Sequence, residues 1–233
     1  DNDIYKGLTM WCPNINIFRD PRWGRGHETY GEDPYLTAAL GVEYVKGMQG
    51  QGEFLKTAAC AKHYAVHSGP EARRHEFDAR VSEKDLYETY LFAFEELVKK
   101  ANVMSVMGAY NRVNSEPACA SEKLMKKLSE WGFDGYFVSD CWAIRDFHTD
   151  HKLTATAEES AALALKRGCD CNCGNTYIYM MKAYEKGLVT EEQIRLAAVR
   201  LFTARYMLGI MEGSEYDAIP YTAVECREHI AKA

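Results

Sequence analysis

Residues 102–142, NVMSVMGAYNRVNSEPACASEKLMKKLSEWGFDGYFVSDCW, decide the fold class. They begin with an apolar, β-rich run at 102–107, which predicts a buried strand. A Gly/Asn loop then leads to Ser121, a residue type that caps helices, and a helix is predicted after it. A second short strand is predicted at 136–139. This order of strand, polar loop, helix and strand is the repeating unit of an α/β fold with a parallel sheet.

The same alternation continues on both sides of this segment. Further strands are predicted at 9–17, 56–61 and 169–171, and helix starts are predicted at Asp33-Pro34, Ser82, Thr156 and Thr190. About five β–α units result, which favours either an open doubly wound sheet or a barrel. The long polar loops all follow strands, as they do at the active-site rim of a (β/α)₈ barrel. The sequence therefore predicts a TIM-barrel-like domain truncated at its N-terminus.

Both ends of the chain resemble interruptions rather than domain boundaries. The first residue is Asp1, not Met, and the last, Ala233, falls inside a helix predicted from about Val224. We therefore expect a fragment in which residues 1–210 form an incomplete barrel.

Composition bounds the function. The 233 residues are 47% apolar, enough for one large core or two small ones. Lys and Arg total 28 against 34 Asp and Glu, a net charge of −6, so a nucleic-acid partner is not expected. No apolar run approaches the roughly 20 residues that span a bilayer, so no membrane partner is expected either. A soluble enzyme or binding domain for a small molecule is predicted.

The eight cysteines are scattered through apolar or strand-like segments. Such spacing favours free buried thiols in a reducing compartment, and so slightly favours the cytoplasm, although the compartment stays open without the natural N-terminus. The C-x-C-x-C pattern at 169–173 places alternate sulfurs on one strand face, which is more typical of barrel packing than of zinc binding.

Four of the predicted rim loops carry clustered polar groups. In the first, Arg19 to Glu28, two Arg flank a Trp and two Gly, which suits a hydroxyl-rich or anionic ligand or a solvated loop braced by Arg–Asp pairs. In the second, Lys62-His63 ends a buried strand, where a lysine needs a carboxylate or a hydroxylated ligand. The third contains Met107 to Asn111. The fourth begins with Asp140, either a pairing residue or a catalytic carboxylate.

Metal and cofactor chemistry is not predicted. His63 and His67 have the i,i+4 spacing of metal ligands on a helix, but Gly69-Pro70 make a helix there improbable. The acidic and His-rich stretch 146–151 has no distant third ligand. No dinucleotide loop, Walker loop, GxSxG elbow or HExxH motif is present.

Five segments together resemble glycoside hydrolase family 3, in order from about Gly7 to Gly209. They are PNINIFRDPRWGRGHETYGEDP (13–34), AKHYAVHSGPE (61–71), VMGAYNRVNSEPACAS (106–121), VSDCWAI (138–144) and GCDCNCGNTY (168–177). The resemblance implies an exo-acting retaining glycosidase with a barrel-like domain followed by an α/β sandwich. Residues 211–233 would then be a linker and the start of that sandwich.

The resemblance also implies roles for individual residues. Asp140 matches the nucleophile; Arg25, Lys62 and His63 match residues that hold sugar hydroxyls, and Met107 and Tyr110 match further wall residues. The general acid/base of the family lies in the second domain, so this chain alone is expected to be inactive. No metal or cofactor is implied. We further expect Lys62 to lower the pKa of Asp140.

Substrate preference is predicted from the residues after Asp140. Many β-glucosidases of the family have Trp directly after the nucleophile, where this chain has Cys141 and then Trp142. This resembles the β-xylosidase branch, which is sometimes also active on α-L-arabinofuranosides, so xylose is favoured over glucose. Cys141 and Cys173 end consecutive predicted strands and are close enough in the barrel order for a disulfide, which Cα atoms more than about 7 Å apart would exclude. A non-catalytic sugar-binding fragment is the competing class.

Overall fold

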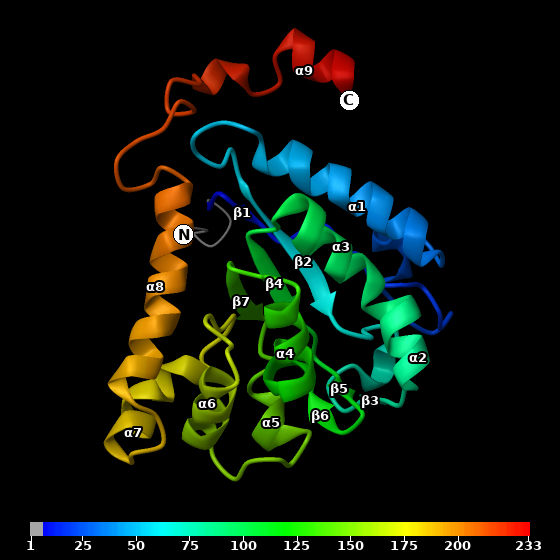
Figure 1. Ribbon diagram of the computed structural model, residues 1–233, viewed down its shortest axis with the longest axis vertical. Coiled ribbons are helices and arrows are strands. Elements are labelled where there is room, and N and C mark those ends of the chain that lie inside the picture. The colour runs from blue at the N-terminus through cyan, green and yellow to red at the C-terminus, as the bar shows by residue number, and fades with distance from the viewer. Residues whose placement is uncertain (1–6) are drawn as a thin grey trace.

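The computed structural model describes residues 7–233, in which a four-stranded parallel sheet forms the centre (Figure 1). Its order is β1, β2, β4 and β7, with bounds Thr9–Met10, Ala58–Tyr64, Ser105–Gly108 and Tyr136–Ser139. Cys171 extends this order by one parallel bridge to Val138. Strands that follow one another in the larger sheet are therefore neighbours in space, as in a (β/α) barrel, and the predicted fold class is confirmed.

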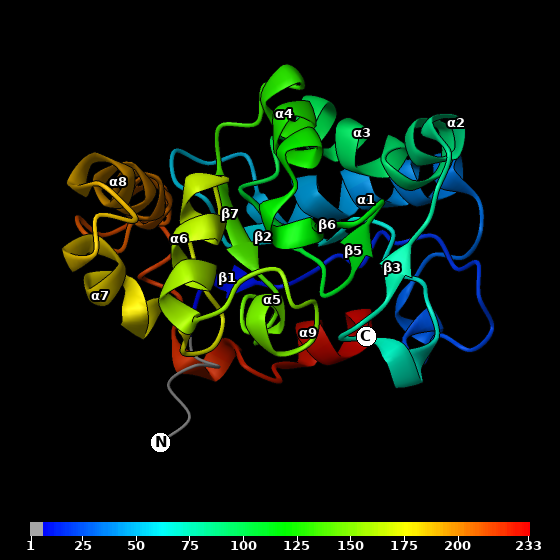
Figure 2. The same cartoon turned by 90° about the horizontal axis from the view of Figure 1, so that it is seen from below.

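Helices α1 (Pro34–Gln49), α3 (Phe92–Ala101) and α4 (Glu122–Glu130) lie together on one side of this sheet (Figure 2). The main apolar core fills the space between them, with fully buried side chains such as Val45, Phe94 and Phe137. A smaller cluster on the sheet joins Cys60, Met107, Tyr136 and Val138 to Ala204.

The remaining elements complete the chain. Ala204 belongs to α8 (Glu191–Met207), which follows α6 (Ala157–Lys166) and α7 (Met180–Glu185). A small second sheet contains β3 (Asp78–Ala79), β5 (Arg112–Val113) and β6 (Glu116–Pro117). Short helices are α2 (Glu83–Asp85), α5 (Asp146–Thr149) and α9 (Arg227–Lys232). None of the helices in residues 7–233 is long and apolar enough to cross a membrane.

Five helix starts confirm the predicted caps. In each, the capping side chain accepts a hydrogen bond from the backbone N–H three residues further on; the caps are Asp33, Ser82, Ser121, Thr156 and Thr190. Each bond satisfies a donor that the first turn of a helix leaves without a partner. The caps fix the first residue of the helix that follows a loop, and therefore the length of that loop.

Two predicted strands are shorter than expected. The segment 9–17 is regular only at β1, because Pro13 has no N–H to donate to a ladder, although Asn14 still bridges to Lys62. The segment 169–171 contributes only the Cys171 bridge. Both segments nevertheless lie beside their neighbours in the expected order. The long loops after β2, β4 and β7 therefore meet at one edge of the sheet.

Candidate active site

Asp140 directly follows β7 at this edge and is only 6% exposed. Its backbone N–H donates to the carbonyl of Gly108, which fixes the residue at the end of β4. Its Oδ1 accepts the N–H of Cys141 at 2.7 Å. Its Oδ2 is 3.5 Å from Nε2 of His63 and 3.9 Å from Nη1 of Arg25, and no donor in residues 7–233 hydrogen-bonds to it. One carboxylate oxygen is thus held and the other is free to react.

The groups around Asp140 come from three different loops. Lys62 and His63 lie near the carboxyl end of β2, Tyr110 follows β4, and Arg25 comes from the first rim loop. Arg25, Lys62 and Tyr110 each act on the charge of Asp140. The structure therefore brings together five predicted site residues that are up to 115 positions apart in the sequence (140 − 25).

Burial is the largest influence on Asp140 and raises its pKa. The N–H of Cys141, then the charges of Arg25 and Lys62 and the hydroxyl of Tyr110, act in the opposite direction. Lys62 thus lowers the pKa of Asp140, as predicted, but burial outweighs the neighbouring cations and the net direction is upward. The same carboxylate, together with burial, raises the pKa of Tyr110.

Arg25 is held by a second carboxylate. Its guanidinium donates two hydrogen bonds to Glu28, at 2.7 and 2.8 Å. This pairing lowers the pKa of Glu28 to about 2, so Glu28 remains ionised and cannot act as a general acid near neutral pH. Its role is to fix the guanidinium beside Asp140.

His63 is 1% exposed and is oriented by Asn16. Oδ1 of Asn16 accepts the backbone N–H of His63 at 2.8 Å and lies 3.0 Å from its Nδ1, while the Asn16 amide donates to the carbonyl of His63. Burial is the main cause that lowers the pKa of His63 well below its ordinary value, so its imidazole is neutral at pH 7. The ring therefore presents Nε2 toward Asp140.

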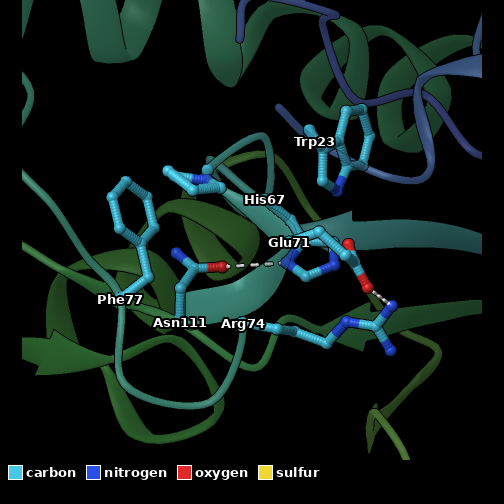
Figure 3. Close-up of a pocket in the computed structure, with 8 residues that line it drawn as sticks. Trp23, His67, Glu71, Arg74, Phe77 and Asn111 are labelled. Atoms are coloured by element: carbon cyan, nitrogen blue, oxygen red, sulfur yellow. Dashed lines mark hydrogen bonds and ion pairs between the residues drawn. The ribbon is translucent and has the colours of Figure 1, made fainter. Parts of the chain in front are cut away.

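A small cavity lies next to this group, and Figure 3 shows the residues that line it. His67 lies within it, with its Nδ1 directed to Oδ1 of Asn111 at 3.2 Å. The edge of the His67 ring meets Trp23, and its centroid is 4.7 Å from that of His63. Arg74 pairs with Glu71 and also lies over the ring of Tyr110. The cavity wall is thus continuous with the surroundings of Asp140.

Two further predicted site residues, Met107 and Trp142, differ in exposure. Met107 is 1% exposed and packs with Cys60 and Val138, one position before the end of β4. Trp142 is 40% exposed, and the guanidinium of Arg145 lies 5.3 Å from the centre of its ring. Met107 thus belongs to the core, while Trp142 lies at the surface.

Cys141 and Cys173 form a disulfide with a Cα–Cα distance of 4.4 Å. The predicted bridge is confirmed, and the prediction of free thiols is wrong for these two residues. It holds for the other six, Cys12, Cys60, Cys119, Cys169, Cys171 and Cys226. The two halves of the bridge come from the loop after β7 and from the next segment in the barrel order. The bridge therefore fixes the backbone next to Asp140.

Asn16 and Asn111 were not predicted as site residues, yet each orients a buried histidine. Both belong to segments that were singled out, at strand ends rich in polar groups. A buried imidazole needs a fixed partner, but the two amides lie 47 and 44 positions from their histidines, so no local signal pairs them.

The fold and this site define a barrel-type domain with a buried carboxylate among cations and imidazoles at its rim. Residues 5–204 match the family model described as the glycosyl hydrolase family 3 N terminal domain, and the chain belongs to this family.

Named relatives support the same assignment. A xylan 1,4-beta-xylosidase of Xylanibacter ruminicola is 46% identical over 95% of this chain and 27% of its own length. Beta-D-xylosidase 1 of Arabidopsis thaliana is 44% identical over 89% of this chain and 28% of its own length. The chain therefore spans less than a third of these relatives.

Solved structures of the family superpose closely. A GH3 exo-beta-xylosidase bound to a xylobiose aziridine probe matches with a TM-score of 0.88 at 34% identity, over 94% of this chain and 30% of that one. A beta-glucosidase from Listeria innocua in complex with isofagomine matches with a TM-score of 0.85 at 29% identity, over 96% and 33%.

Proposed function

We propose that this chain is the greater part of the catalytic barrel of an exo-acting retaining glycoside hydrolase that releases terminal β-D-xylose. The observation that carries the proposal is Asp140, a buried carboxylate at the rim with one oxygen held by Cys141 and the other free. A retaining glycosidase needs such an ionised carboxylate as its nucleophile.

In this mechanism Oδ2 of Asp140 attacks the anomeric carbon of the terminal sugar. A bond forms between that oxygen and the carbon, and the bond to the leaving oxygen breaks as a general acid protonates it. Water, deprotonated by the same group, then cleaves the glycosyl–Asp140 bond and restores the carboxylate. Arg25 and Lys62 donate to the sugar hydroxyls, His63 accepts from one of them, and together they hold the ring for attack.

The general acid/base is proposed to come from a second domain in a longer protein. Glu28 is the carboxylate tied to Arg25, and its lowered pKa disqualifies it as an acid. We accordingly propose that residues 1–210 belong to the barrel and that residues 211–233 lead into an α/β sandwich. The side chains of residues 210–233 are all at least partly exposed, which supports this division.

Xylose is favoured because of the disulfide beside the nucleophile. The Cys141–Cys173 bridge lies next to Asp140 in the chain, and a group packed near C5 of the sugar would exclude the hydroxymethyl that a hexose has and xylose lacks. The names of the relatives from Xylanibacter and Arabidopsis agree with this preference. The alternative is a β-glucosidase with the same mechanism, which the likeness to the Listeria enzyme favours. An alternative of another class is a non-catalytic sugar-binding fragment.

The test compares hydrolysis of aryl β-D-xyloside and aryl β-D-glucoside by the longer protein and by this chain alone. Asp140→Ala is the informative variant, and Asp134→Ala is its control, because Asp134 is exposed at the other end of β7. We expect xyloside preference and loss of activity only in Asp140→Ala. Glucoside preference would overturn the specificity argument and keep the mechanism. Full activity of Asp140→Ala would overturn the mechanism, and sugar binding without hydrolysis by the longer wild-type protein would establish the non-catalytic alternative.

A further inference from the structure

Three buried electron-pair donors converge at the rim of this domain. His63, His67 and Asp140 each place one ring nitrogen or carboxylate oxygen within 4.8 Å of the others. The three residues are 1%, 4% and 6% exposed. His63 lies near the end of β2, His67 in the loop after it and Asp140 directly after β7, so none of the three comes from a helix. The imidazoles of His63 and His67 are therefore close together although residues 63–67 do not form a helix.

Hydrogen bonds determine which nitrogen of His63 carries its proton. The Asn16 amide nitrogen donates to the carbonyl of His63, so the neighbouring Oδ1 of Asn16 is an acceptor. This oxygen lies 3.0 Å from Nδ1 of His63, which must therefore be the donor. The lone pair of neutral His63 is thus on Nε2, the nitrogen that is 3.5 Å from Oδ2 of Asp140.

The same reasoning applies to His67. The Asn111 amide nitrogen donates to the carbonyls of Ala65 and Arg112, so Oδ1 of Asn111 accepts from Nδ1 of His67. The remaining nitrogen, Nε2, carries the lone pair, and it has no hydrogen-bond partner within residues 7–233. Oδ2 of Asp140 has none there either by distance and angle, although the hydroxyl of Tyr110 is near enough to lower the pKa of this carboxylate.

Nε2 of His63, Nε2 of His67 and Oδ2 of Asp140 are therefore all hydrogen-bond acceptors, and none of the three can donate a proton to another. We propose that His63, His67 and Asp140 form a binding site for a divalent transition-metal ion of the zinc type. Neutral imidazole nitrogens and a carboxylate oxygen are ligands that zinc prefers, with water as the fourth. A zinc ion so bound occupies the oxygen of Asp140 that attacks the sugar, and it inhibits hydrolysis; this consequence rests on the proposed function.

The distances between the ligand atoms and the charges around them determine how tightly this site can bind a metal ion. Ligands about 2.0–2.1 Å from a tetrahedral zinc are about 3.4 Å from one another, close to the 3.5 Å between His63 and Asp140. Asn16 and Asn111 supply the outer hydrogen bonds that fix the tautomers of metal-binding histidines. Arg25, 3.9 Å from Asp140, and Lys62 oppose a cation, so we expect reversible binding that a chelator removes.

The binding test uses Co²⁺ as a spectroscopic probe in the longer protein at neutral pH, with Zn²⁺ as the competitor. We expect one equivalent of Co²⁺ with the visible spectrum of tetrahedral coordination and no thiolate charge-transfer band. The affinity should fall by about tenfold or more in His67→Gln and in Asp140→Asn. The matched control is His75→Gln, because His75 is a half-exposed histidine that bonds to Asp146 and lies outside the cluster.

The outcomes separate the metal site from the proposed function, because the spectrum needs no hydrolysis. Absence of binding, a spectrum that survives His67→Gln, or a thiolate band would overturn the site. A tetrahedral spectrum in an enzyme with no glycosidase activity would support the site and overturn the proposed function. In the active enzyme, inhibition by Zn²⁺ should weaken in His67→Gln in parallel with the loss of Co²⁺ affinity. Inhibition of equal strength in both proteins would place the inhibitory ion elsewhere.

Discussion

Asp140 and Asp170 flank the same strand, β7, and each is 6% exposed, but their carboxylates are satisfied differently. Asp170 accepts the backbone N–H of Phe137 at 2.9 Å on Oδ2 and Nη1 of Arg200 at 2.8 Å on Oδ1. Asp140 has a hydrogen-bond donor on Oδ1 but none within residues 7–233 on Oδ2. Burial raises the pKa of both.

The comparison shows that burial alone does not identify a reactive carboxylate. A buried charged group without full hydrogen bonding costs about 1–3 kcal/mol or more, so a protein retains one where it is used. Asp170 connects β7 to the segment before Cys171 and serves stability. Asp140 keeps an electron pair free, and we propose that it serves chemistry. Substitutions at and around the two aspartates can separate these two roles.

The largest effect is expected for Asp140→Asn in the longer protein. Xyloside hydrolysis should fall by about 10³-fold or more, because the amide is a poor nucleophile. The protein should unfold at the same or a higher temperature at pH 7. The folded-state pKa is raised, so the ionised carboxylate destabilises the fold above that pKa, and the neutral amide removes this penalty. Activity assays and thermal unfolding at pH 7 measure the two effects.

Azide provides the control for this variant. In Asp140→Gly the anion can occupy the space of the lost carboxylate and attack the sugar, giving a glycosyl azide of inverted configuration. Loss of activity together with a much lower unfolding temperature would mean that Asp140, like Asp170, is mainly structural.

The next effect concerns the disulfide that joins the segments of the two aspartates. Cys141 and Cys173 are 32 positions apart, and the double variant Cys141→Ala/Cys173→Ala should lose about 3–4 kcal/mol of unfolding free energy by loop-closure entropy. It should also hydrolyse aryl glucoside better relative to aryl xyloside, by up to about tenfold. Urea unfolding and the ratio of kcat/KM values measure these changes.

Cys226→Ser is the control, since Cys226 is a free, partly exposed thiol and should change the unfolding free energy by less than about 0.5 kcal/mol. An unchanged ratio of the two sugars would show that the bridge serves stability alone.

A smaller effect is expected for Asp170→Ala, which leaves the buried N–H of Phe137 without its acceptor. The unfolding free energy should fall by about 2 kcal/mol in urea, with kcat/KM of the folded enzyme reduced little. Arg200→Ala should cost less, because the Arg200 side chain is 49% exposed. Loss of catalysis without loss of stability would reverse the roles assigned to the two aspartates.

The sequence predicts much of this arrangement, but not the distinction between the two aspartates. Helix caps such as Thr190 and the order of the strands follow from local residue types, because capping and periodicity are local effects. The grouping of Arg25, His63 and Asp140 followed from motif resemblance. Asp170 is paired with Arg200, whereas Oδ2 of Asp140 has no hydrogen-bond donor among the described residues. This difference depends on how distant segments pack, and the spacing of residues in the sequence does not predict it. For the same reason the sequence predicts the effect of Lys62 on the pKa of Asp140 but not the larger, opposite effect of burial, which is a property of the whole fold.

The smallest effect, and the sharpest test of the rim, is a shift in pH dependence caused by Lys62→Met. In the proposed mechanism Asp140 must be ionised to attack, so activity should be lost as the pH falls through its pKa, which burial raises above the ordinary aspartate value. Lys62 lowers that pKa, so its removal raises it further and moves the acid limb of kcat/KM to higher pH. Lys56→Met, an exposed lysine just before β2, is the control and should leave the limb in place. A lower kcat/KM with an unmoved limb would show that Lys62 binds the sugar without tuning Asp140. In that case Arg25 and the N–H of Cys141 would be the groups that oppose the rise in the pKa of Asp140 caused by burial. The carboxylate would then be kept ionised by the first rim loop, which carries Arg25, and by the backbone next to Asp140.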